Sequence, residues 1–142
     1  MVAADAKEIL MKIKECDVRI ANKTEDIERI TDMITKITVA WREDVVSGGN
    51  KDHDKIGAAV AKLIDIKESM ISDIDSYVKA RELIMEALNS IKNPLLFDVL
   101  YKRYVLYKKW ETISEEMNYK DVRGVYKLHG KALRTFSKIY NH

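Results

Sequence analysis

The chain has 142 residues, 46% hydrophobic and 34% charged, which fits a soluble protein with one domain or a domain plus an extension. One proline and five glycines leave room for long helices, and the single cysteine, Cys16, excludes an internal disulfide and a multi-cysteine zinc site. No apolar run is long enough to cross a bilayer and the N-terminal residues lack an apolar signal region, so we expect a cytoplasmic protein without a membrane partner.

The first predicted element is a long helix over residues 3–41, a segment without glycine or proline. Its apolar residues recur at alternating spacings of four and three, which is typical of a helix that packs along another helix. Lys23 occupies one position of this repeat, and Asp5 is expected to cap the first turn. The apolar seam comprises Ile9, Ile13, Cys16, Ile20, Ile27, Ile30, Ile34, Ile37 and Trp41.

The segment VVSGGNKDHD, residues 45–54, interrupts this helix, and Asp52 or Asp54 is expected to cap the next one. A second helix is predicted over residues 55–91 with the same alternating spacing, so residues 1–93 should form a long antiparallel helical hairpin. The second seam comprises Ile56, Val60, Leu63, Lys67, Met70, Ile74, Tyr77, Arg81, Ile84, Leu88 and Ile91.

A two-helix hairpin leaves apolar side chains uncovered beside its seam. We therefore expect it to pack on another copy of itself, which makes the protein a homo-oligomer, or on the C-terminal segment of the same chain. These extra apolar residues are Ile64, Ile66, Ile71, Val78 and Met85.

Pro94 marks the expected boundary of a second domain, residues 94–142, because proline suits the first turn of a helix. A third helix is predicted over residues 94–107, with a stripe of Leu96, Leu100, Arg103 and Tyr107 and with Phe97 and Tyr104 beside it. A short helix follows with Trp110, Ile113 and Met117, and residues 118–120 turn the chain. Asp121 is the predicted N-cap of the last helix. The apolar stripe of that helix comprises Val122, Val125, His129, Ala132, Phe136 and Ile139.

Positive charge is concentrated in the last third of the chain. Residues 1–93 carry a net charge of −3 and residues 94–142 a net charge of +5. The last helix holds a basic stripe opposite its apolar one, either a solvated face or the face of a helix that enters the major groove of DNA. This basic stripe comprises Arg123, Lys127, Lys131, Arg134 and Lys138.

On the DNA interpretation, residues near the helix N-terminus reach the base edges. The candidates for base contact are Lys120, Arg123, Gly124 and Lys127, with Arg123 favoured because its planar fork matches guanine, and Gly124 because it allows close backbone approach. The candidates for phosphate contact are Lys108, Lys109, Lys131 and Arg134.

The segment LYKRYVLYKKWETISEEMNYKDVRGVYKLHGKAL resembles the helix-turn-helix of sigma-70 region four, over residues 94–139. From residue 45 onward the chain is also similar to a small phage-encoded family of unknown function, in which a helical hairpin with a loop like SGGNKDHDKI precedes such a tail. That family is related to phage late-gene transcription regulators of the ArpU and RinA type. The resemblance implies an all-α fold, sequence-specific binding of double-stranded DNA, transcription control in a phage or prophage, and RNA polymerase or another transcription protein as a further partner. The part of sigma factors that melts promoter DNA has no counterpart here.

Other functions receive less support from the sequence. No nucleophile–base–acid set and no glycine-rich phosphate loop is visible, so we expect no enzyme, no small-molecule substrate and no cofactor. His129 is expected to be a core residue, and the acidic loop at residues 50–54 matches no metal-ligand spacing. The alternatives left open are a packaging component of small-terminase type and a protein-interaction module that does not bind DNA.

Overall fold

The computed structural model describes residues 3–46 and 53–141, and within these ranges the chain is helical with no strand. The predicted all-α class is therefore confirmed. The helices are α1 (Ala3–Val46), α2 (His53–Asn89), α3 (Pro94–Leu100), the π-helical η1 (Tyr101–Val105), α4 (Trp110–Glu116) and α5 (Val122–Tyr140).

The chain divides into two compact units. The hairpin unit comprises residues 19–77, and the core unit comprises the described residues 3–18 and 78–141. The boundary expected at residues 93 and 94 separates α2 from α3, but both sides of it belong to the core unit.

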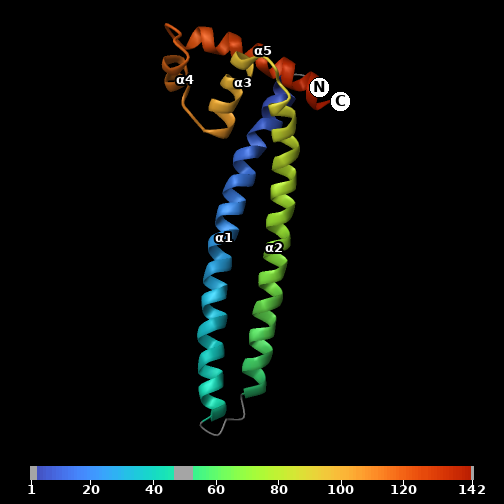
Figure 1. The fold of residues 1–142 in the computed structure, drawn as a ribbon, viewed down its shortest axis with the longest axis vertical. Coiled ribbons are helices and arrows are strands. Elements are labelled where there is room, and N and C mark those ends of the chain that lie inside the picture. Colours follow the sequence, from blue (N-terminus) through green and yellow to red (C-terminus); the bar gives the residue numbers. More distant parts are fainter. Residues whose placement is uncertain (1–2, 47–52, 142) are drawn as a thin grey trace. The chain divides into compact units, whose positions relative to one another are not determined.

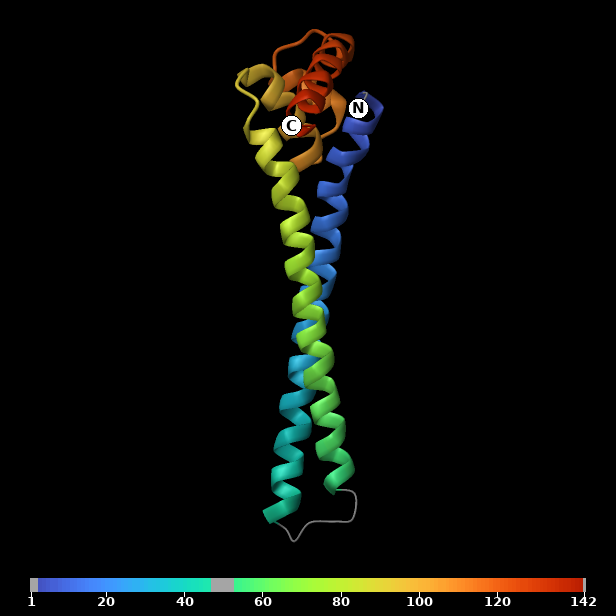
Figure 2. The ribbon, with the colours of Figure 1, turned by 90° about the vertical axis from the view of Figure 1, so that its right-hand side faces the viewer.

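Within the hairpin unit, α1 and α2 run antiparallel beside each other (Figures 1 and 2). Lys23 Nζ lies 3.2 Å from Asp73 Oδ2, which joins the two helices by an ion pair. At the other end of the unit, Trp41 stacks on His53 with ring centroids 4.2 Å apart, and its indole N–H donates to the His53 carbonyl. Antiparallel pairing follows from these two contacts.

The predicted seam of the hairpin is confirmed by burial, since every one of its members is buried or half-buried. Lys23 and Lys67 also lie half-buried in it, as expected for long side chains whose stems cover apolar surface. Ile64, Ile66 and Ile71 are exposed, as their position beside the seam predicts. The two helices of the hairpin unit therefore contact each other along one seam, and the apolar side chains beside the seam stay exposed.

The expected helix starts differ from the observed ones. Helix α1 already includes Ala3, so Asp5 lies inside the first turn and is not the residue before it. Helix α2 begins at His53, which places Asp54 in its first turn. Asp52, the other expected cap, lies outside the described residues, as does most of the loop at residues 45–54.

The core unit closes around fully buried side chains from five helical segments, and Tyr104 of η1 is buried beside them. Its central residues are fully buried and come from the start of α1, the end of α2, and α3, α4 and α5. The ends of the two long helices therefore help to complete the C-terminal core. Of the five apolar residues beside the seam, only Met85 packs against this core, whereas Ile64, Ile66, Ile71 and Val78 are exposed. Fully buried members include Leu10, Ile13, Leu88, Leu100, Ile113, Val125 and Phe136.

Helix α3 begins as the sequence predicts, with Pro94 in its first turn and the Asn93 side chain accepting hydrogen bonds from the Leu95 and Leu96 amides. The expected stripe through Arg103 and Tyr107 is wrong. The backbone widens into a π-helix at residues 101–105, where the Leu106 amide donates to the Tyr101 carbonyl. This wide turn shifts the register by one residue, so that Tyr104 is the buried side chain.

Helices α4 and α5 are joined by residues 117–121, in which Asn118 has a positive φ of 63°. Asparagine tolerates that left-handed conformation better than most residues. Asp121 is extended and its carboxylate accepts a hydrogen bond from the Arg123 amide at 2.9 Å. The predicted turn and the predicted N-cap of the last helix are both confirmed.

Candidate nucleic-acid interface

Helix α5 has two faces of opposite character. One face is anchored in the core unit by Val125, Ala132, Leu133 and Phe136, all of which are buried. Leu133 was absent from the predicted stripe, although its spacing of four from His129 and three from Phe136 would have placed it there. The other face carries five cations, and the helix contains no acidic residue. All five side chains of the basic stripe are exposed: Arg123, Lys127, Lys131, Arg134 and Lys138.

The start of α5 holds its arginine close to the helix cap. The Arg123 guanidinium lies 2.9 Å from Asp121 Oδ2, and the Arg123 side chain is 84% exposed. Hydrogen bonds from the Arg123 side chain and from the backbone amides of Arg123 and Gly124 lower the pKa of Asp121. An ion pair this exposed is weak, so Arg123 can exchange its carboxylate partner for an anion that approaches the helix.

Gly124 has a structural role that the sequence interpretation missed. A Cβ built at this position would lie 2.5 Å from Cδ1 of Tyr119, much closer than van der Waals contact allows. Tyr119 is half-buried and packs against the core. The absent side chain therefore makes room for the Tyr119 ring, and this contact by itself explains the glycine.

Of the predicted phosphate contacts, Lys108 is already engaged. Its ammonium lies 2.7 Å from both carboxylate oxygens of Glu116, and Lys102 Nζ lies 2.9 Å from the same carboxylate. These hydrogen bonds, the one from Lys108 foremost, lower the pKa of Glu116. Lys108 therefore supports the turn between η1 and α4, while its neighbour Lys109 is exposed at the N-cap position of α4.

The remaining predicted residues share one property, which is exposure to solvent. Lys120, in the turn before α5, is exposed, as are Lys127, Lys131 and Arg134 along the helix. The Arg134 guanidinium lies over Gly130, since a Cβ there would be 3.6 Å from its Nη1. Lys120 therefore lies just before α5, Arg123 and Lys127 lie in its first two turns, and Lys131 and Arg134 lie further along the helix.

An aromatic cluster joins the buried side of α5 to the preceding segments. Tyr104 Oη lies 2.7 Å from His129 Nε2, and the Trp110 ring makes edge contacts with His129 and Tyr126. Burial is the main reason that the pKa of His129 falls to about 4 and that of Tyr104 rises to about 12, so both side chains are neutral near pH 7. The expectation that His129 is a hydrogen-bonded core residue is confirmed.

Tyr126 is a candidate contact residue that the sequence analysis missed. It is 46% exposed on α5, between the positions of Arg123 and Lys127. Its ring contacts Trp110 edge-on at 5.3 Å between centroids. The signal was its spacing of three from Arg123, which puts its aromatic ring beside the predicted contact residues.

No cluster of three or more histidine, cysteine or acidic side chains capable of holding a metal ion occurs among the described residues. In the same part of the chain, no helix is both long enough and apolar enough to span a membrane. Comparisons with protein-family models, with curated proteins and with solved structures each found no match.

Proposed function

We propose that this protein binds duplex DNA through α5 and acts as a phage-type transcription regulator. The observation that carries the proposal is the exposed basic stripe on an acid-free helix whose opposite face is fixed in a core. A helix of this kind fits the major groove, where the phosphate walls attract cations on both sides. The sigma-like pattern of residues 94–139 supports the same assignment, with α4 as the supporting helix and α5 as the reading helix of a helix-turn-helix.

The length of the basic stripe is suited to this task. From residue 123 to residue 138 an α-helix rises by about 22 Å, which is shorter than the ~34 Å of one DNA turn. The N-terminal residues Lys120, Arg123 and Lys127 then face base edges, and Lys131 and Arg134 face the phosphates beside them. Lys109 contributes a phosphate contact from the start of α4, whereas Lys108 first has to leave Glu116.

The hairpin unit serves as an oligomerisation or docking surface in this proposal. Ile64, Ile66 and Ile71 are exposed along α2, and Met33 and Val39 along α1. Apolar side chains of this kind are covered when a second copy or a transcription protein such as RNA polymerase binds. A ring of many copies would instead favour a packaging component of small-terminase type, and light scattering on the purified protein separates the two assemblies.

The test is a fluorescence-anisotropy titration of the full chain with duplexes selected from a random pool, repeated over a salt series. The affinity should fall steeply with salt because bound lysines and arginines displace counterions. Arg123→Ala should cost about 1–3 kcal/mol on the selected sequence and reduce its advantage over random DNA. Lys109→Ala should weaken all sequences alike and lower the salt slope by about 1.

Lys62→Ala is the matched control, because Lys62 is an exposed lysine of the hairpin unit. Its affinity for DNA should equal that of the unchanged protein. The proposal fails if the full chain shows no salt-dependent binding to any duplex, or if Lys62→Ala weakens binding as much as Arg123→Ala. In the first case, capture of a protein partner would favour an interaction module.

A further inference from the structure

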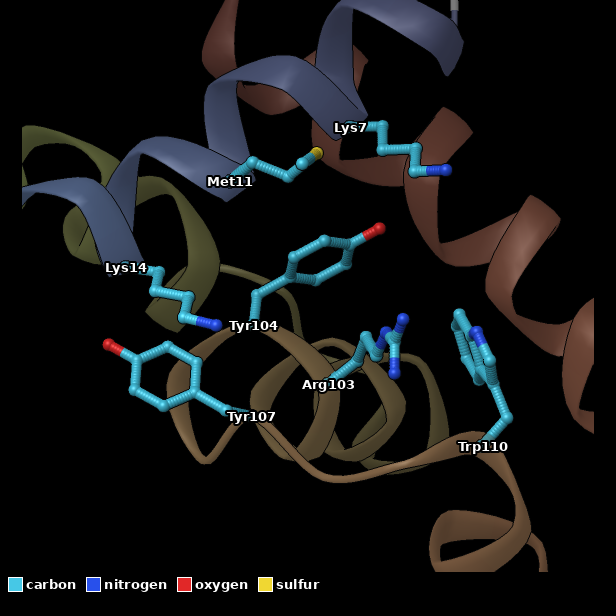
Figure 3. A pocket seen from close by; sticks show the side chains of 7 residues that line it. All are labelled: Lys7, Met11, Lys14, Arg103, Tyr104, Tyr107 and Trp110. Carbon is cyan, nitrogen blue, oxygen red and sulfur yellow. The ribbon is translucent and has the colours of Figure 1, made fainter.

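A pocket with a cavity volume of about 320 Å³ lies within the core unit, and none of its lining residues belongs to α5. Side chains from α1 face side chains from residues 103–110 across it (Figure 3). The volume is at the lower end of the range for small-molecule sites. Its lining comprises Lys7, Met11, Lys14, Arg103, Tyr104, Tyr107 and Trp110.

The lining is cationic and contains no acidic residue. Lys7 and Lys14 are exposed on the same face of α1, about two helical turns apart. Arg103 is held in place, because its Nη1 donates to the Lys108 carbonyl at 2.9 Å and its guanidinium lies 4.4 Å from the Trp110 ring centroid. Three positive charges therefore converge on one cavity.

The pocket also has aromatic walls. Tyr104 is buried and its hydroxyl is bonded to His129, while the Tyr107 hydroxyl donates to Asp17. These hydrogen bonds fix both phenol rings, and the contact with Arg103 fixes Trp110. Rings held in this way present apolar area with little loss of side-chain entropy on binding.

Two unusual backbone features occur in the same wall. Arg103 and Tyr104 belong to the π-helical segment η1, and Tyr107 has a positive φ of 58°. A π-turn is rare and is frequently found at functional sites, and a bulky residue in the left-handed region costs about 1–3 kcal/mol. The backbone therefore adopts a costly conformation where it presents three of the lining side chains.

We infer that this pocket binds a small organic anion that carries a planar ring. The three cations match a carboxylate or phosphate group, the fixed rings match a planar partner, and the volume suits one such molecule. The inference goes beyond the proposed DNA binding and does not depend on it. Duplex DNA is a less suitable occupant, because the cavity is formed by α1 and the 103–110 segment and not by the basic stripe of α5.

Calorimetric titration of the full chain tests this assignment with AMP, indole-3-acetate and benzoate as ring-bearing anions. Adenosine serves as the uncharged counterpart of AMP, and inorganic phosphate serves as the anion without a ring. At least one ring-bearing anion should bind with a Kd of about 1 mM or tighter, and adenosine and phosphate should bind at least about tenfold more weakly than AMP if AMP is that anion. Failure of all three anions to bind overturns the inference.

Alanine substitutions of exposed lysines test where the anion binds without disturbing the buried core. Lys7→Ala and Lys14→Ala should each weaken binding by about tenfold, because each removes a charged hydrogen-bond donor. Lys12→Ala, an exposed lysine of the same helix that does not line the pocket, should leave the affinity unchanged. Equal effects of all three substitutions would contradict the assignment.

Trp110 provides a second readout, since Trp41 is the only other tryptophan and lies in the hairpin unit. In a Trp41→Phe protein, the bound anion should change the emission of Trp110, and Lys14→Ala should shift this change to higher ligand concentration. Bound anion without any change in emission places the ligand elsewhere and overturns the inference. A duplex that changes the emission when none of the three anions does so also overturns it, in favour of a DNA phosphate.

Discussion

The two units of this protein bury apolar surface in different ways. In the core unit, residues such as Leu100, Ile113 and Phe136 are completely inaccessible to solvent, and five helical segments surround them. In the described part of the hairpin unit, the most buried apolar side chains are those of Ile30 and Met70, which are still 9% and 8% exposed. The hairpin unit is held by one seam, and the core unit by a closed interior.

Because of this difference, truncation of a side chain should cost more stability in the core unit, while the hairpin unit exposes more of its apolar surface. A closed interior loses a large transfer free energy and gains a cavity when one side chain is truncated, whereas a seam between two helices is open to solvent on both sides. The core unit can therefore hold α5 and the aromatic cluster in fixed positions. The hairpin unit keeps apolar side chains accessible to a partner.

The largest expected effect comes from truncating the closed interior. Phe136→Ala should lower the free energy of unfolding by about 3–5 kcal/mol. Phe136 is fully buried, so its truncation leaves a cavity that the surrounding side chains can only partly fill. Ile34→Ala removes a half-buried seam residue and should cost only about 1–2 kcal/mol. Denaturant unfolding followed by circular dichroism measures both.

Hydrogen exchange adds the location of each loss. Phe136→Ala should release amides of α3, α4 and α5, and Ile34→Ala should release amides of residues 19–77. Equal losses of stability from the two substitutions would contradict the contrast between a closed core and an open seam.

Acid should act on the core unit through His129. Its pKa of about 4 in the fold lies below the usual 6.5, because burial disfavours the charged ring. Between these values the unfolded chain binds a proton that the folded chain does not, so stability is complete above pH 6.5 and is lost as the pH falls toward 4. The loss should reach about 3 kcal/mol at the bottom of this window.

Denaturant unfolding at a series of pH values measures this loss, and His129→Gln provides the control. Glutamine offers Tyr104 an uncharged hydrogen-bond partner and cannot titrate. The slope of stability against pH between 6.5 and about 5 should therefore disappear in this variant. An unchanged slope would assign the acid sensitivity to other groups.

Alanine substitution of Gly124 tests its packing against Tyr119, and the same substitution of Gly130, elsewhere in α5, provides the comparison. Gly124→Ala should cost about 1–3 kcal/mol, because the new Cβ would overlap the Tyr119 ring. Gly130→Ala has only an ordinary contact at 3.6 Å and should stabilise the helix by about 0.5–1 kcal/mol. Thermal unfolding of both variants measures the difference in sign, and Tyr119→Ala should make Gly124→Ala harmless. A loss of DNA affinity by Gly124→Ala alone, without a loss of stability, would return Gly124 to the proposed interface.

The regular parts of this fold were predictable because they depend on spacing within one segment. Apolar residues at spacings of four and three determined both seams, and the Asp121 cap followed from a short-range preference for such residues before a helix. The basic stripe is equally local, since its members lie on one face of one helix. Local rules therefore predicted the helices and the cations that α5 exposes.

The remaining features depend on contacts between segments that the sequence does not pair. The π-turn at residues 101–105 brings Tyr104 to His129, which is 25 residues away. Lys108, just before α4, pairs with Glu116 at the end of that helix. Tyr119 packs against Gly124 because the turn between α4 and α5 places its ring beside the start of α5. The pocket joins α1 to a segment some ninety residues later, so no pattern within one segment could indicate it.

The smallest expected effects on stability come from breaking ion pairs. The coupling energy should again be larger in the core unit than in the hairpin unit, because the core unit holds its side chains more firmly. Lys23 and Asp73, 3.2 Å apart and a third to a half exposed in the hairpin seam, should have a coupling energy of about 0–1 kcal/mol. Asp17 lies 2.6 Å from Arg81 Nε in the core unit and also accepts a hydrogen bond from the Tyr107 hydroxyl. Because this carboxylate has two fixed partners, its coupling to Arg81 should exceed that of the seam pair, toward the top of the same range. Double-mutant cycles with alanine at both positions of each pair measure the two energies. A larger coupling for Lys23 and Asp73 would mean that the open seam is held by charge and not by the apolar side chains of its repeat.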